Sequence, residues 1–266
     1  MGQTQPPSRL FHVPLMPIPY FDALPQECRQ AYIALDRRLD GISAKGRARL
    51  LMQARDPLLR DRLHNADATH LRHKLSEHFT ALNADHYEAS RIDQEINALT
   101  RLWPGGGTAD QSFASGVTGI REALRLRTTY RDGPCHSRKD LGGYQVLFPG
   151  VAHIPERLRA MDDFVAANLG RSRSFTATVA MNAICNLHPF QNGNGRTSRV
   201  LFNLLIGNPQ LPPLYVPLYA LSKISHGGFL IRLRQAQYHN DWHPLADFIA
   251  SGLDLLCSVQ TSELAL

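Results

Sequence analysis

The sequence predicts an all-α fold with one short β segment. Apolar residues recur at helical spacing along most of the chain, and glycine and proline interrupt them at intervals. Only the stretch around residues 144–154 carries the residue pattern of strands and a tight turn. With 43% hydrophobic and 20% charged residues among 266, the chain has the composition of a globular protein.

The N-terminal part divides into an arm and a helical region. Residues 1–26 are rich in proline, which predicts an extended arm that wraps the body. Between residues 27 and 102, leucines recur at near-helical spacing among arginines and aspartates, so we expect several helices. The run Trp-Pro-Gly-Gly-Gly at residues 103–107 is the clearest break. We therefore expect an arm over 1–26, a helical region over 27–105 and a core domain over 106–266.

The core domain is expected to hold the β segment and most of its helices. Residues 144–148 form a strand-like run, and Pro149-Gly150 turns the chain towards residues 151–154, which predicts a β-hairpin. A helix should begin at Pro155 and end at Gly170. Other helices are predicted over residues 112–126, 175–187, 194–206 and 226–256.

Composition also narrows the classes of function. The net charge of +6 suits a phosphate-bearing ligand or an acidic partner, but the basic residues are dispersed, which argues against nucleic acid. No apolar run reaches the roughly 20 residues of a membrane helix, and the N-terminus lacks the pattern of a signal peptide. The expected location is the cytoplasm, with non-classical secretion as the alternative. The four cysteines are far apart, so we expect reduced thiols and no zinc site.

The segment that carries chemistry is His188-Pro-Phe-Gln-Asn-Gly-Asn-Gly-Arg-Thr-Ser-Arg199. It predicts the end of one helix, a tight turn and the start of the next helix. Gly193 and Gly195 let the backbone approach a ligand closely, and the first N–H groups of the new helix attract an anion. Arg196 and Arg199 share one helix face, where both guanidinium groups can bind phosphates. His188 precedes the turn, where a neutral imidazole could accept a proton from a hydroxyl.

Each of these features has an ordinary structural explanation when it stands alone. A histidine at a helix end is usually a surface or capping residue, a Gly-Asn-Gly turn usually marks a helix boundary, and a pair of arginines is usually a solvated face. Their occurrence together within 12 residues favours a polyphosphate site.

The segment resembles the motif of the Fic family, HPFx[D/E]GNGRxxR, and matches every fixed position except the acidic one, which is Asn192. The likeness extends over roughly residues 110–256, with Gly142-Gly143-Tyr144 and the following hairpin resembling the Fic flap. The resemblance implies an all-α core and the transfer of a nucleotide monophosphate, usually AMP from ATP, to a Ser, Thr or Tyr hydroxyl of a target protein.

The same resemblance assigns roles to individual residues. His188 would deprotonate the target hydroxyl, and Phe190 would anchor the loop in the core. Gly193, Asn194 and Gly195 would line the anion hole, while Arg196 and Arg199 would hold the outer phosphates. Residues 144–152 would act as the flap that pairs with an extended target segment, with contacts from the following three residues: Tyr144, Val146 and Leu147.

Asn192 takes the position whose carboxylate holds Mg²⁺ in active members of the family. An amide oxygen can coordinate Mg²⁺ but brings no negative charge, and Gln191 offers no replacement. Three outcomes stay open: weak metal-dependent transfer, altered chemistry, or nucleotide binding without turnover.

Residues 88–95 resemble the Fic inhibitory helix, [S/T]xxxE[G/N], whose Glu pairs with the second arginine of the motif. Ala89 replaces the Ser or Thr, Asp93 the Glu and Gln94 the Gly. Asp93 is therefore the candidate inhibitory residue, and a solvated acidic face is the alternative. Our leading hypothesis is a nucleotidyltransferase that uses ATP or another nucleoside triphosphate and Mg²⁺, and the competing one is a nucleotide-binding module that works through protein contacts.

Overall fold

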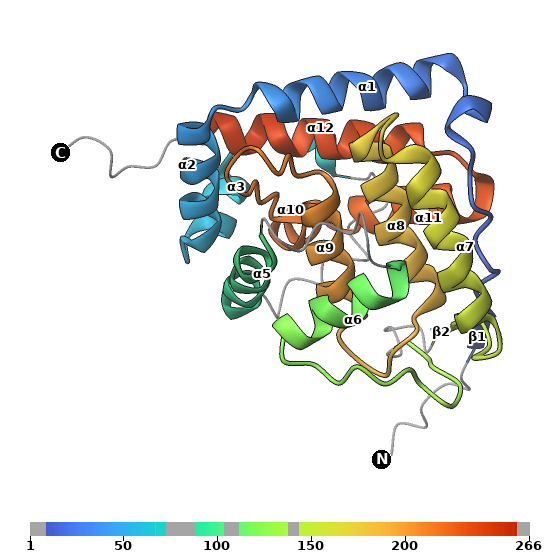
Figure 1. The fold of residues 1–266 in the computed structure, drawn as a ribbon. Coiled ribbons are helices and arrows are strands. Elements are labelled where there is room, and N and C mark those ends of the chain that lie inside the picture. The colour runs from blue at the N-terminus through green and yellow to red at the C-terminus, as the bar shows by residue number, and fades with distance from the viewer. Residues whose placement is uncertain (1–8, 67, 73–88, 104–111, 138–143, 260–266) are drawn as a thin grey trace, which may run out of the picture.

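The computed structural model describes residues 9–66, 68–72, 89–103, 112–137 and 144–259, and it confirms a mostly helical fold. Helices α8 and α9 lie in the middle of the molecule, and α1 and α12 run side by side along one edge (Figure 1). The break expected at residues 103–107 lies outside the described residues from Pro104 onwards, and so does Gly142-Gly143.

Within the described residues, the N-terminal part consists of an extended segment from residue 9 onwards and several helices. The arm contains strand β1 (Arg9–His12) and the 3-10 turn η1 (Phe21–Ala23). Its residue Met16 is fully buried, and the Met16 N–H donates to Asn186 Oδ1 at 2.9 Å. The helices that follow are α1 (Gln26–Gly41), α2 (Ala44–Arg55), α3 (Leu59–Asn65), η2 (Thr69–Leu71) and α5 (Ala89–Leu102).

The helices of the core begin and end close to the predicted positions because their caps are local. Ser112 and Ser172 each accept a hydrogen bond from a backbone N–H of the first turn that follows. The predicted tail is two helices, since Asn240 turns the chain with a left-handed φ of 55°. The elements are α6 (Phe113–Ala123), α7 (His153–Asn168), α8 (Arg173–Leu187), α9 (Asn194–Leu205), α10 (Leu218–Ile224), α11 (Gly228–His239) and α12 (His243–Ser258).

Helix α8 is the centre of the core, and nearly all its side chains are buried. Its polar residues are satisfied internally: the Thr176 and Thr178 hydroxyls each donate to the carbonyl four residues earlier, and Asn182 Nδ2 donates to Leu233 O. A helix buried on all sides holds its C-terminal end rigidly. His188 is the residue at that end.

The β segment has a different partner from the one expected. Strand β2 (Tyr144–Leu147) forms, but residues 153 and 154 already belong to α7, so the second hairpin strand predicted at 151–154 is wrong. Instead, β1 pairs with β2 in parallel, with Arg9 opposite Tyr144 and His12 opposite Leu147. On the other edge, residues 135–137 pair with residues 146–148 in the antiparallel sense. The pairing therefore depends on chain segments that are distant in sequence.

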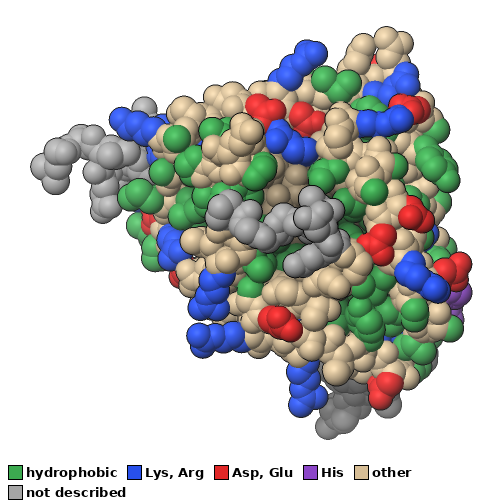
Figure 2. Space-filling model, in the orientation of Figure 1, with side chains coloured by type: hydrophobic (Ala, Val, Ile, Leu, Met, Phe, Trp, Pro, Cys, Tyr) green, Lys and Arg blue, Asp and Glu red, His purple; other side chains and the backbone are tan. Residues whose placement is uncertain are grey.

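Lysine and arginine side chains are spread over the face shown in Figure 2, with acidic side chains between them, as the sequence indicated. None of the helices in the described ranges is both long and apolar enough to cross a membrane.

Candidate functional site

The loop between α8 and α9 has the predicted helix-turn-helix form. His188 ends α8 with a left-handed φ of 50°, and Gly193 precedes α9 with a φ of 76°. A Cβ atom on Gly193 would lie 2.6 Å from Leu126 Cδ1, so both the backbone and the packing require glycine. Phe190 is fully buried and anchors the loop, as expected.

Asn194 holds the loop rather than presenting its side chain to a ligand. Its Oδ1 accepts from the Phe190 N–H at 3.1 Å, and its Nδ2 donates to Phe190 O at 2.7 Å. The side chain is almost completely buried. Any contact of Asn194 with an anion must therefore come from its backbone N–H.

The His188 ring is well packed and is neutral at pH 7. It stacks on Phe148 with a centroid separation of 3.8 Å and an interplanar angle of 12°. The pKa of His188 is lowered from 6.5 to about 4, mainly by burial and also by the charges of Arg131 and Arg234, while a contact with Cys185 O opposes the shift. Nδ1 lies 3.4 Å from that carbonyl oxygen, which can only accept, so Nδ1 carries the hydrogen. Nε2 is then left with a free lone pair at neutral pH.

Arg131, which the sequence did not single out, ties the loop to the β segment. Its guanidinium donates to His188 O at 2.7 Å, to Gly133 O at 2.7 Å and to Pro149 O. Its own N–H donates to Pro189 O at 2.9 Å. With a further bond from the guanidinium to Leu187 O at 3.3 Å, five hydrogen bonds from one buried residue hold the backbone around His188.

The first turn of α9 forms the predicted anion-attracting helix start. The first intrahelical bond after the turn runs from Thr197 N to Gly193 O at 2.9 Å, so the N–H groups of residues 194–196 point out of the helix end. At Gly195 a Cβ atom would lie 3.1 Å from the Arg199 guanidinium. The glycine thus leaves room for that side chain.

Both motif arginines are held by α5. Arg196 donates to Gln94 Oε1 at 2.8 Å, and Arg199 Nε lies 3.0 Å from Glu95 Oε1. Glu95 is completely buried and also accepts from the Tyr215 hydroxyl at 2.8 Å. Burial alone would lower the pKa of Arg199, but the Glu95 carboxylate outweighs it and raises that pKa. Arg199 is therefore a mostly buried cation paired with a fully buried carboxylate.

Asp93 does not lie at Arg199, so the expected pairing of Asp93 with the second motif arginine is wrong. Its carboxylate is about half exposed and lies 3.8 Å from Arg55. Residues two apart on a helix point about 200° away from each other, which explains why Glu95 and Asp93 lie on different faces. Glu95 shares a face with the buried Ile92 and Leu99, and this helical spacing was the available signal.

The metal position does not provide the ligands that Mg²⁺ prefers. Asn192 and Gln191 are exposed amides at the turn. Across the described ranges, no group of three or more His, Cys, Asp or Glu side chains is arranged to hold a metal ion. The residues present at this turn therefore do not fit a magnesium site built on carboxylates.

A pocket of about 330 Å³ lies beside Asn192. At its base Arg121 is almost completely buried, and its guanidinium lies over the Phe190 ring at 3.7 Å. Arg121 also donates to Asn192 O at 3.1 Å and to Thr197 Oγ1 at 3.2 Å. The sequence analysis missed this residue because nothing along the chain links Arg121 to the motif. The lining residues are Arg121, Arg127, Thr129, Tyr130, Arg131, Asp132, Gln191 and Asn192.

The flap residues Tyr144, Val146 and Leu147 lie in β2 and are half-buried. One edge of β2 is paired with β1, and the Phe11 and Tyr144 rings are 5.3 Å apart. The other edge is bonded to residues 135–137, including Ser137 N to Val146 O at 2.8 Å. In this arrangement β1 covers one edge of β2 along its whole length, and residues 135–137 cover the C-terminal part of the other edge.

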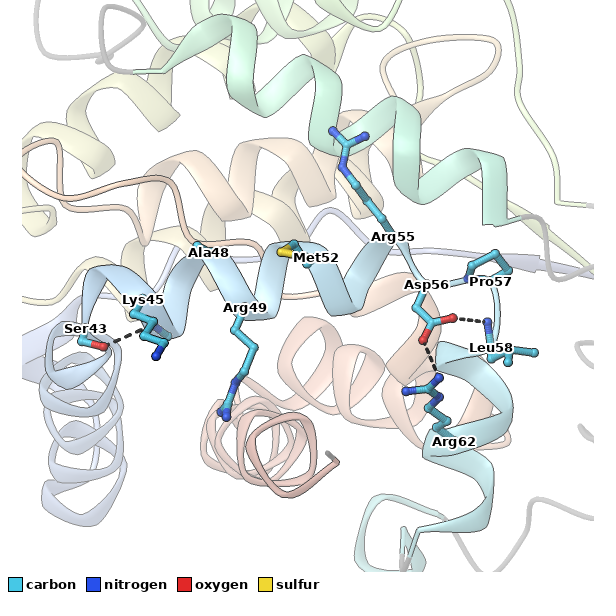
Figure 3. A pocket seen from close by; sticks show the side chains of 11 residues that line it. Ser43, Lys45, Ala48, Arg49, Met52, Arg55, Asp56, Pro57, Leu58 and Arg62 are labelled. Atoms are coloured by element: carbon cyan, nitrogen blue, oxygen red, sulfur yellow. Dashed lines mark hydrogen bonds and ion pairs between the residues drawn. The ribbon is translucent and has the colours of Figure 1, made fainter. Parts of the chain in front are cut away.

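A second, larger groove of about 960 Å³ lies away from the motif, on α2, α3 and the turn between them (Figure 3). Lys45 and Arg49 project from α2, Met52 is 69% exposed, and Arg62 pairs with Asp56 at 3.1 Å. No motif residue lines this groove. This larger groove is therefore not lined by His188, Arg196 or Arg199.

Comparison with known proteins relates this geometry to one family. The model of the Fic/DOC family matches residues 117–206. "Protein adenylyltransferase Fic" of Drosophila willistoni is 34% identical over 120 residues, which are 44% of this chain and 22% of that protein. The Drosophila melanogaster protein of the same name is 34% identical over 90 residues, which are 34% of this chain and 16% of that protein. The matched part is thus less than a quarter of either relative.

The fold as a whole agrees with a solved structure. A Fic family protein from Desulfovibrio desulfuricans G20 superposes with a TM-score of 0.55 over 91% of this chain and 78% of that chain, at 17% identity. This likeness supports the fold alone, while the family match covers both helices that flank the motif. The chain thus contains a Fic/DOC domain over residues 117–206.

Proposed function

We propose that this protein transfers a nucleotide monophosphate, with AMP as the first candidate, from a nucleoside triphosphate to a Ser, Thr or Tyr hydroxyl of a target protein. The observation that carries the proposal is the neutral His188 imidazole beside a helix start and two arginines. A base, an anion site and cations for a leaving group are the parts that such a transfer needs.

In the proposed reaction, the target oxygen attacks the α-phosphorus as Nε2 of His188 takes the hydroxyl proton. The bond from the α-phosphorus to the bridging oxygen breaks, and pyrophosphate leaves with the electron pair. The N–H groups at the start of α9 bind the phosphates, and Arg196 and Arg199 stabilise the charge of the leaving group.

Glu95 restrains this site in the proposal. While its carboxylate occupies Arg199, that guanidinium is not available to the outer phosphate of the nucleotide. The inhibitory function expected of Asp93 therefore passes to Glu95. Gln94 at Arg196 adds a weaker, neutral restraint.

The target would reach His188 by taking the place of β1. An extended segment that displaces β1 finds the free N–H and C=O groups of β2, whose end leads into Phe148 and the His188 ring. The cytoplasm stays the predicted location.

The test is transfer of label from α-labelled ATP, GTP, CTP and UTP, with Mg²⁺ or Mn²⁺, to the protein itself or to proteins in a cell lysate. His188→Ala is the control, because loss of a general base typically costs about 10²–10⁴-fold in rate. Labelling that is equal for the parent and His188→Ala would refute the proposed base.

A nucleotide-binding module without turnover is the second candidate, and the amide at Asn192 favours it. Measurable ATP binding without labelling, in the parent and after removal of the Glu95 carboxylate, would support it.

A further inference from the structure

The inference starts from the charge balance around Asn192 and rests on the proposed nucleotide site. A metal-assisted site places a carboxylate there, so that the metal bridges protein and phosphate. Here the turn offers two amides, and the adjoining pocket is lined by three arginines and one carboxylate, Asp132. A divalent cation placed in this pocket would be repelled by more charges than attract it. The pocket suits an anion.

Arg121 strengthens this charge because its described surroundings hold no counter-ion for it. Its partners are Arg127 O at 2.5 Å, Asn192 O, Thr197 Oγ1 and the Phe190 ring, all of them uncharged. Burial, and to a lesser extent the charge of Arg196, lowers the pKa of Arg121 to about 10, so the guanidinium stays cationic at neutral pH. Arg199, by contrast, forms an ion pair with the Glu95 carboxylate.

A buried cation without a counter-ion is costly, and proteins usually pair it. An anion bound at the loop would reduce this cost for Arg121. Arg127 lines the same pocket and is exposed, so it can contact a ligand directly. Arg121 is covered, so it acts through its charge and by holding the Asn192 backbone.

We propose that Arg121 and Arg127 supply the positive charge beside Asn192 that a divalent cation would otherwise bring, so that the protein binds a nucleoside triphosphate without metal. Arg127 is a phosphate-binding residue in this proposal, and Arg121 is a positioning residue. The amide at position 192 is then suited to the site, because a carboxylate there would pair with the arginines and repel the phosphates.

The first experiment measures ATP affinity by calorimetry in EDTA and in Mg²⁺, for the parent and for Glu95→Gln, which releases Arg199. We expect dissociation constants that agree within about threefold with and without Mg²⁺. Arg127→Gln should weaken metal-free binding by about tenfold, the lower end for a charged hydrogen bond. Arg125→Gln is the matched control: it removes the same charge from an exposed residue two positions away that does not line the pocket, and it should bind as the parent does.

The second experiment reverses the charge balance with Asn192→Asp, which hardly changes the side-chain shape. We expect metal-free ATP binding to weaken by about tenfold or more and Mg²⁺ to restore it, so that this variant becomes metal-dependent. Arg121→Lys, which keeps the charge of the parent, should keep metal-independent binding. Arg121→Met should lose it, and circular dichroism checks that Arg121→Met is folded.

Two results would overturn the proposal. The first is that Mg²⁺ raises the affinity of the parent for ATP tenfold or more. If Asp132→Asn then abolishes this rise, Asp132 is the residue that binds the metal. The other is an equal effect of Arg127→Gln and Arg125→Gln. In both cases ATP still binds, so the proposed transferase survives. ATP that binds neither the parent nor Glu95→Gln, with or without Mg²⁺, would refute the transferase as well.

Discussion

Replacing Glu95 by glutamine tests whether α5 restrains the site. The substitution keeps the side-chain shape but removes the charge opposite Arg199. In the parent, Glu95 is fully buried and accepts hydrogen bonds from Arg199 and from Tyr215. In Glu95→Gln, Arg199 loses its charged partner and becomes available to an outer phosphate.

Glu95→Gln should have two opposite effects, one on stability and one on the affinity for ATP. Removing one partner of a buried ion pair costs about 3–5 kcal/mol of stability, and with an amide still in place we expect about 3 kcal/mol. For a chain of this size that lowers the melting temperature by roughly 6–12 °C. A guanidinium that gains a charged hydrogen bond to phosphate contributes about 1.5–3 kcal/mol, which is about 10–150-fold in ATP affinity. Glu95→Gln should therefore be less stable without ligand and bind ATP more tightly.

The assay combines thermal unfolding with and without ATP, calorimetry, and incorporation of labelled AMP. Asp93→Asn is the matched control, since Asp93 lies two residues away on the same helix and contacts Arg55 at the surface. Asp93→Asn should change the free energy of unfolding by no more than about 0.5 kcal/mol and should leave the affinity for ATP unchanged.

Two outcomes would refute this reasoning. In one, Asp93→Asn tightens ATP binding and Glu95→Gln does not, which would return the inhibitory function to the residue expected from the sequence. In the other, Glu95→Gln lowers stability as expected but leaves ATP affinity and labelling unchanged. The Glu95–Arg199 pair would then be purely structural.

Three further predictions follow from the site. The pKa of His188 is lowered from 6.5 to about 4, mainly by burial, so the unfolded state binds more protons than the folded state between these pH values. The free energy of unfolding should therefore fall as the pH drops through this window, by at most about 1.4 kcal/mol per pH unit. Urea unfolding between pH 4 and 7 measures this slope, and an equal slope for the parent and His188→Gln would contradict the prediction. Arg196→Ala should weaken ATP binding by about 1.5–3 kcal/mol and AMP binding much less, since its proposed contact lies beyond the α-phosphate; equal losses in calorimetry would contradict that placement. Removing residues 1–12 should raise labelling of target proteins, because it uncovers one edge of β2. Removing only residues 1–8 keeps β1 and should leave labelling unchanged. Equal labelling of the two truncations would count against the displacement of β1.

The sequence alone was sufficient for the features that depend on neighbouring residues. The loop from His188 to Arg199 could be predicted because a helix end, a glycine turn and a helix start are local events. The same holds for the helices that begin after Ser112 and Ser172, whose hydroxyls cap the helices directly following them. The burial of Phe190 was implied by the resemblance to the Fic motif.

Only the tertiary structure decided which distant groups meet this loop. β2 pairs with β1 across more than a hundred residues, because strand pairing leaves no local record of its partner. Glu95 rather than Asp93 faces Arg199 because the packing of α5 on α9 selects one helix face, and a shift of two residues points away from it. Arg121 and Arg131 likewise reach the loop from elsewhere in the chain. The motif residues proposed to bind the phosphates thus lie in one segment of the sequence, while the charged groups that surround this segment are brought there by long-range packing.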